Sequence, residues 1–293
     1  MSESLVERLK SGPVLVADGA TGTMLQAVGL PSGVIPEEWN IEQPAKIAAL
    51  HQAYLKAGST IILANTFGGN RIKLGRAKKA DLAAEANRRA LEIARAAAEP
   101  YGAFVAADVG PTGEVLEPYG DLTFEAAVTA YAEQARFLAE AGADALWLET
   151  LSDVNEARAA IEGIRTVTSL PILCSFSFER SGRTMMGLTP RKAAETLGPL
   201  GLAALGANCG ASLDDTMAAV AAIAAALPGL PLIAKPNAGL PSLVDGRSVY
   251  NTTPEEMAGY AVRFVAQGAR IVGGCCGSTP AHITAIAKAV KAA

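Results

Sequence analysis

The stretch Arg270-Ile-Val-Gly-Gly-Cys-Cys-Gly277 (RIVGGCCG) begins as a short apolar run and ends in a glycine-rich phrase. The same order recurs along the chain, each time before a longer alanine-rich stretch of helical character. Continuous apolar runs, rather than alternating ones, are typical of parallel strands covered by helices. Seven further runs have this form: VLVADGATG (14–22), TIILANTFGGN (60–70), FVAADVGPTG (104–113), ALWLET (145–150), PILCSFSF (171–178), LAALGANCG (202–210) and PLIAKPNAG (231–239).

The residues between these runs carry helix start and stop signals. Thr253-Pro254-Glu255-Glu256 combines a threonine cap, a proline at the first helical position and a glutamate placed for a capping box. Thr189-Pro190 and Thr279-Pro280 repeat this start, and Gly58 and Gly268 stand where a helix should end before the next strand. Eight strand–helix units predict a (β/α)8 TIM barrel, with residues 1–293 as a single domain. An open doubly wound sheet is the alternative, but eight units favour closure.

Composition excludes several classes of protein. The chain has 293 residues and a net charge of −4, and its lysines and arginines form no run, so we expect no nucleic-acid partner. The longest apolar run, residues 217–227, is too short to span a bilayer. The first ten residues lack the apolar core of a secretory signal, and four cysteines are too few for a disulfide scaffold. We therefore expect a cytoplasmic protein that does not contact membranes.

Polar residues stand at the ends of the predicted strands. In a barrel these ends meet at one mouth, where active sites are built. Any one such residue could simply cap the next helix. Asp108 could support the site residues from behind or cap a loop, and we favour the loop role. A polar group at every strand end, with three thiols among them, favours a site instead. The residues are Asp18, Asn65 with Thr66, Asp108, Glu149, Ser175, Asn208 with Cys209, Lys235 with Asn237, and Cys275 with Cys276.

Adjacent cysteines pair poorly with each other, because the small ring strains the disulfide. Cys275 and Cys276 end the eighth predicted strand and Cys209 ends the sixth, so one strand separates them and all three sulfurs could reach one point. Three thiolates can hold a tetrahedral zinc ion (Zn²⁺) whose fourth position stays open. The alternative is that these cysteines are small apolar fillers. We expect that filler role for Cys174, which lies within a strand.

Three thiolates leave zinc a weak Lewis acid, which suits a fourth sulfur better than water. A substrate thiol bound there loses its proton near neutral pH and remains nucleophilic. The three cysteines therefore predict alkylation of a thiol, above all by a methyl group. The two histidines, His51 and His282, are expected on helix surfaces and are not assigned to the metal.

The chain resembles the homocysteine-binding barrel of the zinc-dependent homocysteine S-methyltransferases. The likeness runs from DGATGTMLQ (18–26) to VGGCCGSTPAHI (272–283) and includes ANTFGGN, GPTGE, LWLET, GANCG and KPNAGLP. Among subfamilies, DGATGTMLQ, NTFG and PNAGLP are most similar to the homocysteine module of cobalamin-dependent methionine synthase. The resemblance implies that homocysteine is methylated to methionine, with its zinc-bound thiolate as the nucleophile.

The resemblance also implies roles for particular residues. Cys209, Cys275 and Cys276 would bind zinc. Carboxylates suit the substrate ammonium group in a mouth that we expect to be short of lysine and arginine. The implied substrate-binding residues are Asp18 and Glu149 for the amino group, with Asn65, Thr66 and Ser175 around the amino-acid end.

The methyl donor is left open by the residues themselves. The resemblance favours methylcobalamin, carried by a corrinoid- and methyltetrahydrofolate-binding module or partner protein. A stand-alone enzyme using S-methylmethionine is the alternative. Betaine is less favoured because a quaternary ammonium group usually binds in a cage of aromatic side chains, and only Trp39, Tyr119 and Tyr250 could supply one. Two further hypotheses are a non-catalytic zinc- or thiol-binding barrel and an aldolase-like barrel with Lys235 as a Schiff base.

Overall fold

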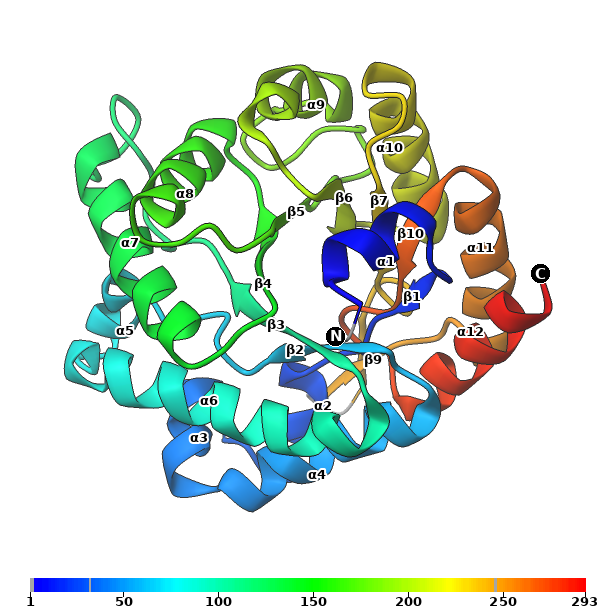
Figure 1. The fold of residues 1–293 in the computed structure, drawn as a ribbon, viewed down its shortest axis with the longest axis horizontal. Helices are drawn as coiled ribbons and strands as arrows, with labels where there is room; N and C mark the ends of the chain where they lie inside the picture. The colour runs from blue at the N-terminus through cyan, green and yellow to red at the C-terminus, as the bar shows by residue number, and fades with distance from the viewer. Residues whose placement is uncertain (1–2, 32, 245–246) are drawn as a thin grey trace.

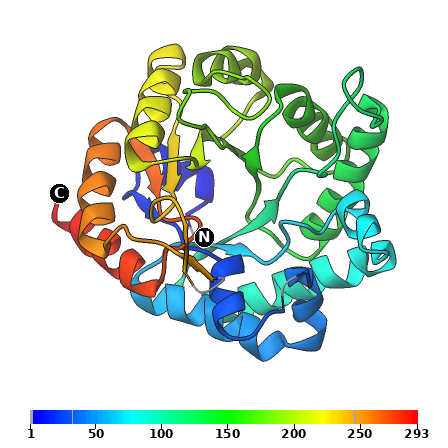
Figure 2. The same cartoon turned by 180° about the vertical axis from the view of Figure 1, so that it is seen from behind.

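The computed structural model describes residues 3–31, 33–244 and 247–293, so residues 1–2, 32 and 245–246 of the predicted domain lie outside it. The described residues form a ring of helices around a barrel of eight parallel strands, which Figure 1 shows along the barrel axis and Figure 2 from behind. The barrel strands are β1 (Leu15–Val16), β2 (Ile61–Ala64), β3 (Phe104–Val109), β4 (Ala145–Leu151), β5 (Ile172–Phe176), β6 (Ala204–Cys209), β7 (Leu232–Pro236) and β10 (Ala269–Val272).

The barrel is closed, as eight strand–helix units predict. The strands follow the order β1-β10-β7-β6-β5-β4-β3-β2. A parallel bridge between Ala17 and Ile61 joins the two ends of this order. The Thr60 N–H also donates to the Val16 carbonyl at 2.8 Å. Each of the eight predicted apolar runs contributes to one barrel strand, so the (β/α)8 prediction is confirmed and the open sheet is excluded.

Helices follow the strands and cover the outer face of the barrel. At the predicted capping box, the Thr253 hydroxyl accepts from the Glu256 N–H at 3.2 Å, and the Glu256 carboxylate accepts from the Thr253 N–H at 2.8 Å. The longer helices are α4 (Pro44–Ala57), α6 (Ala83–Ala98), α7 (Phe124–Glu140), α8 (Val154–Val167), α9 (Pro190–Leu197), α10 (Leu213–Ala226), α11 (Pro254–Ala266) and α12 (Pro280–Ala292).

Short elements fill the loops between them. These are α2 (Gly22–Ala27), α3 (Trp39–Glu42), α5 (Arg71–Arg76), the 3₁₀ turns η1 (Pro36–Glu38), η2 (Ala80–Leu82), η3 (Glu99–Tyr101) and η4 (Gly198–Leu200), and the hairpin strands β8 (Ser242–Val244) and β9 (Arg247–Val249). Across the described part of the chain, no helix combines the length and the apolar character needed to cross a membrane.

The first helix, α1 (Leu5–Ser11), closes one end of the barrel. Leu5 and Leu9 are buried and join the cluster of apolar side chains inside the barrel, which includes Leu15, Trp147 and Ile271. In Figure 1 this helix, drawn in dark blue, lies across the barrel interior. The opposite end, at the carboxyl ends of the strands, is therefore the one that remains for a site.

The structure corrects the placement of both histidines, which are buried rather than on helix surfaces. Burial lowers the pKa of His51 to about 4, so this ring is neutral near pH 7. His282 accepts from the Thr279 N–H at 3.1 Å through Nδ1, and its Nε2 lies 3.0 Å from the Thr252 carbonyl oxygen. His282 thus ties the start of α12 to the loop before α11. Cys174 is fully buried in β5, as predicted.

Candidate active site

The strand ends converge on a cavity of about 440 Å³. Residues from seven of the eight barrel strands, or shortly after them, line it, which confirms the predicted convergence at the barrel mouth. These lining residues are Asp18, Asn65, Asp108, Glu149, Cys209, Lys235, Cys275 and Cys276.

Two of the residues implied for the substrate lie behind the cavity wall. Thr66 is buried, and its hydroxyl donates to the Asp108 carbonyl oxygen at 2.7 Å. Ser175 is also buried, and its hydroxyl accepts from the Trp147 indole N–H at 3.0 Å. Asn65 does line the cavity. The structure therefore brings Asn65 to the cavity and places Thr66 and Ser175 where they support its walls.

The three predicted metal ligands meet at the cavity. The Cys209 sulfur lies 3.2 Å from the Cys275 sulfur and 3.7 Å from the Cys276 sulfur, and all three thiols are free. In a tetrahedral site with Zn–S bonds of about 2.3 Å, sulfur atoms lie about 3.8 Å apart, so the cluster needs to open by only about half an ångström. No fourth histidine, cysteine or carboxylate joins this cluster within the described residues. The donor set fits zinc with one position open toward the cavity.

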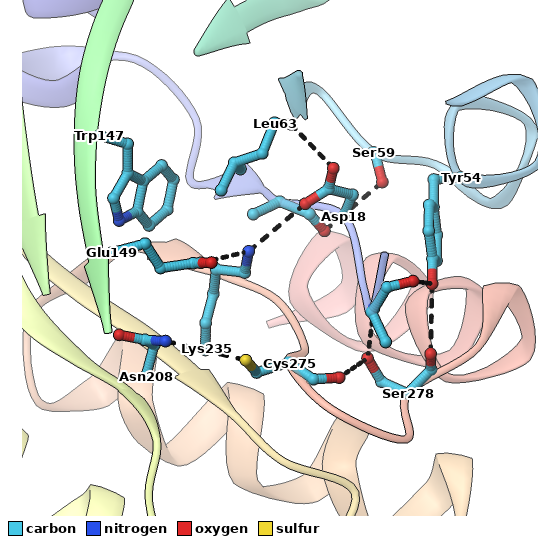
Figure 3. A network of polar contacts seen from close by, with 12 residues as sticks. Asp18, Tyr54, Ser59, Leu63, Trp147, Glu149, Asn208, Lys235, Cys275 and Ser278 are labelled. Carbon is cyan, nitrogen blue, oxygen red and sulfur yellow. Dashed lines mark hydrogen bonds and ion pairs between the residues drawn. The ribbon is translucent and has the colours of Figure 1, made fainter. Parts of the chain in front are cut away.

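The backbone around the cysteines is specialised. Cys209 has φ of 55°, uncommon for a residue with a side chain, and Asn208 before it holds the strand end. The Asn208 amide receives the Thr150 N–H at 2.9 Å and donates to the Thr150 hydroxyl at 2.6 Å. Its Nδ2 also lies 3.7 Å from the Cys275 sulfur (Figure 3). Asn208 therefore links the strand end that carries Cys209 to the Cys275 thiol.

Glycine is required on both sides of the cysteine pair. Gly277 has φ of 77°, and a Cβ there would lie 2.0 Å from the ring of Tyr250. A Cβ at Gly274 would lie 2.3 Å from the Ser278 hydroxyl, which donates to the Cys275 carbonyl at 2.7 Å. These contacts explain why the pair is embedded in glycines: a side chain at either position would push the loop away from its packing partners.

A buried ion-pair cluster lies beside the thiols (Figure 3). Lys235 Nζ lies 2.8 Å from Glu149 Oε1 and 3.4 Å from Asp18 Oδ1. The second oxygen of Asp18 accepts from the Leu63 N–H at 2.8 Å. The expectation of a mouth short of lysine and arginine is therefore wrong, because a lysine stands between the two carboxylates implied for the ammonium group.

Burial and charge act against each other in this cluster. Burial raises the pKa of Asp18 to about 6 even though Lys235 lowers it. Burial also raises the pKa of Glu149, again against Lys235. Burial alone would lower the pKa of Lys235, but the charges of Glu149 and Asp18 outweigh it and raise that pKa. Lys235 is therefore a protonated, ion-paired ammonium group, which argues against the Schiff-base hypothesis, since that chemistry needs a neutral amine.

Asp108 does not cap a loop as expected. Its side chain lines the cavity, and its Oδ1 atom is buried without a hydrogen-bond partner. Two further ionisable residues of the cavity, Glu37 and Lys73, were not predicted. Glu37 accepts from the Gly68 N–H, and Lys73 Nζ lies 4.2 Å from the Phe67 ring centre. Glu37 lies in η1 and Lys73 in α5, within long connections after β1 and β2 that emerge at the barrel mouth, but no local pattern singles out either residue.

Comparisons with known proteins identify the family of this chain. A family model described as homocysteine S-methyltransferase matches residues 15–290. Methionine synthase from Mycobacterium tuberculosis (strain ATCC 25618 / H37Rv) is 32% identical over 297 residues, which cover 94% of this chain and 24% of that protein. Methionine synthase from Mycobacterium leprae (strain TN) is 31% identical, over 98% of this chain and 25% of that protein. The chain thus spans about a quarter of the length of these curated relatives.

Solved structures give the same result. The metallated form of the homocysteine methyltransferase MmuM from Escherichia coli matches with a TM-score of 0.78 and 28% identity, over 94% of this chain and 96% of that chain. A methyltransferase from Methanosarcina mazei matches with a TM-score of 0.66 but 12% identity, which supports the fold alone. Because the family model matches almost from the first barrel strand to the last helix, the chain belongs to the homocysteine S-methyltransferase family.

Proposed function

We propose that this barrel transfers a methyl group to the thiol of homocysteine, giving methionine. The observation that carries the proposal is the meeting of three free thiols, with room for one more ligand, at the wall of a cavity that also presents carboxylates. Family membership supports homocysteine as the substrate. The proposal places the homocysteine-binding unit in the barrel formed by residues 1–293.

The thiols of Cys209, Cys275 and Cys276 would hold zinc. When bound, zinc would lower the pKa of an incoming thiol while the electron-rich sulfur donors leave it nucleophilic. The protein supplies the rest: Asn208 fixes the strand end beside the Cys275 sulfur, and the glycine turn after the pair holds both thiols toward the cavity. No general base is required at this site, because the metal would take over its task.

The amino-acid end of the substrate would lie against the carboxylates. Asp18 and Glu149 supply negative charge for the ammonium group, and Lys235 holds both side chains in place. Asn65 contacts the substrate directly in this proposal, while Thr66 and Ser175 act through the neighbours that they hydrogen-bond. This arrangement orients the substrate so that its thiol reaches the cysteine cluster.

For the donor we propose methylcobalamin, brought by a corrinoid- and methyltetrahydrofolate-binding module or protein. The similarity to methionine synthases about four times as long supports a donor on additional domains. A stand-alone enzyme using S-methylmethionine is the second candidate, favoured by the similarity to MmuM over 96% of that chain. Betaine lacks a cage: Trp39 is buried in the core, Tyr119 is 86% exposed, and Tyr250 alone packs beside the cysteine loop.

The decisive experiment supplies zinc-loaded protein with homocysteine and, in parallel, methylcobalamin, S-methylmethionine or betaine, and measures methionine. Cys276→Ser should abolish product formation with every donor, whereas Cys174→Ala, a matched change at a buried thiol away from the cavity, should leave it intact. Tight binding of zinc and homocysteine without methionine from any donor would instead favour the non-catalytic thiol-binding barrel.

A further inference from the structure

We propose that Asp108 is the principal acceptor for the substrate ammonium group. The inference rests on the proposed function and refines it, because Asp18 and Glu149 are already engaged by another residue. Asp108 is 7% exposed, lines the cavity, and carries a buried oxygen, Oδ1, without a hydrogen-bond partner. A buried, unpaired carboxylate oxygen is costly, so its presence in a cavity points to a donor that arrives with the ligand.

The other two carboxylates have less capacity to accept. One oxygen of Asp18 receives the Leu63 N–H and the other faces Lys235. Glu149 receives Lys235 at 2.8 Å through Oε1. An ammonium group approaching either residue must share it with the Lys235 cation, which repels it. Asp108 makes no salt bridge with Lys235 or with any other cation in the described part of the chain.

The charge balance of the cavity calls for a cation. Its lining contains four carboxylates, from Asp18, Glu37, Asp108 and Glu149, and two ammonium groups, from Lys73 and Lys235. With all six ionised, four negative and two positive charges leave a net charge of −2. Burial, and after it the negative charge of Glu149, raises the pKa of Asp108 well above its usual range. A ligand ammonium group beside Asp108 would offset this repulsion and stabilise the ionised carboxylate.

The geometry also separates the two ends of the ligand. Asp108 lies near the end of β3, Cys209 ends β6, and Cys275 and Cys276 follow β10, so Asp108 and the cysteines approach the cavity from different sectors of the barrel. A cavity of about 440 Å³ can hold an amino acid that bridges them. Asp108 therefore selects for an aminothiol and rejects a thiol of the same length that lacks the amino group.

Three small-molecule thiol ligands test this selection. Homocysteine carries both the amino and the carboxyl group, 3-mercaptopropylamine lacks the carboxyl group, and 4-mercaptobutanoate lacks the amino group. Their dissociation constants for the zinc-loaded protein are measured by calorimetry, and kcat and KM are measured with the active donor. In Asp108→Asn we expect binding of the two amines to weaken about 10- to 100-fold, the range for a hydrogen bond to a charged group. Binding of 4-mercaptobutanoate should change less than about twofold, since it makes no such bond.

Equal weakening of all three thiols would overturn the proposal, because it would mean that Asp108 only shapes the cavity. Unchanged binding of homocysteine would overturn it as well. Asp121→Asn is the matched control, since Asp121 follows the same strand but is exposed and outside the cavity lining. If Asp108→Asn does not fold, Asp108→Ser removes the charge with a smaller side chain and should show the same selective loss. Asp108→Glu, which keeps the charge, should restore part of the preference for amines.

The outcomes distinguish this inference from the proposed function. If the wild-type protein forms no methionine with any donor, the proposed function fails whatever the variants show. If the wild-type protein forms methionine and Asp108→Asn keeps the same preference for amines, only the assignment of Asp108 fails.

Discussion

Replacing Lys235 with methionine removes the only cation that faces Asp18 and Glu149 within hydrogen-bonding or ion-pair distance in the described residues. Methionine has a similar length and leaves the packing against Trp147, whose ring centre lies 5.2 Å from Nζ, largely in place. The change therefore tests the buried charge cluster rather than the core around it.

The magnitude follows from burial. The Lys235 side chain is 3% exposed, and that of Asp18 is 2% exposed. Breaking a buried ion pair by deleting one partner costs about 3–5 kcal/mol of unfolding free energy, because the remaining charge is uncompensated. In Lys235→Met the carboxylates can escape this cost by taking up protons. Their folded pKa values rise further above the unfolded ones, so the variant loses stability as pH rises and recovers it as pH falls.

The assay is urea unfolding of wild type and variant at about pH 8 and at about pH 5.5. We expect a deficit of about 3–5 kcal/mol at the higher pH and a clearly smaller one at the lower pH. Lys288→Met, at an exposed position of α12, is the matched control and should change stability by less than about 0.5 kcal/mol. A Lys235→Met deficit below about 0.5 kcal/mol, or one equal at both pH values, would refute the buried charge cluster.

Two further predictions concern the metal and the pH dependence of binding. Cys209→Ser should lose zinc, measured with a chromophoric chelator, while Cys174→Ala should keep it. Zinc loading of the wild-type protein should release about one to two protons. The reason is that hydrogen bonds to Cys275 and Cys276 raise the pKa of Cys209, so this thiol is protonated without metal. Full zinc content in Cys209→Ser would contradict the ligand set. Methionine, whose thioether does not titrate, should bind about tenfold more weakly at pH 5 than at pH 8, because burial raises the pKa of Asp18 to about 6 and also raises the pKa of Asp108 and Glu149, so these carboxylates lose charge as pH falls. A flat calorimetric profile would show that these carboxylates do not attract the ammonium group.

The cysteine cluster was predictable from the sequence because the fold that brings the cysteines together was also predictable. Eight apolar runs with helix caps between them predict a closed barrel, and closure fixes which strands are neighbours. Only β7 lies between β6 and β10, so Cys209 had to come close to Cys275 and Cys276. The turn residues around the pair, such as Gly277, belong to the same local pattern.

The partners of Lys235 were not predictable in this way. Lys235 is 86 residues from Glu149 and 217 residues from Asp18, and nothing in either local pattern indicates which side chains point at each other. The positions of the Asp108 and His282 side chains were not predictable either. Asp108 was expected to serve a loop, which is a common role for aspartate, and His282 is buried although it lies in the first turn of a helix. Each depends on the direction of a side chain in the packed barrel.

The sequence by itself determined the barrel and the meeting of the three sulfurs, because apolar periodicity, helix caps and strand order are carried by residues close together along the chain. Only the tertiary structure decided the charge balance of the cavity. Four groups from separate strands set this balance: the buried ammonium group of Lys235, the carboxylates of Asp18 and Glu149 that it pairs with, and the unpaired carboxylate of Asp108. Their interactions depend on distances of a few ångströms and on the exclusion of water, which no local pattern encodes.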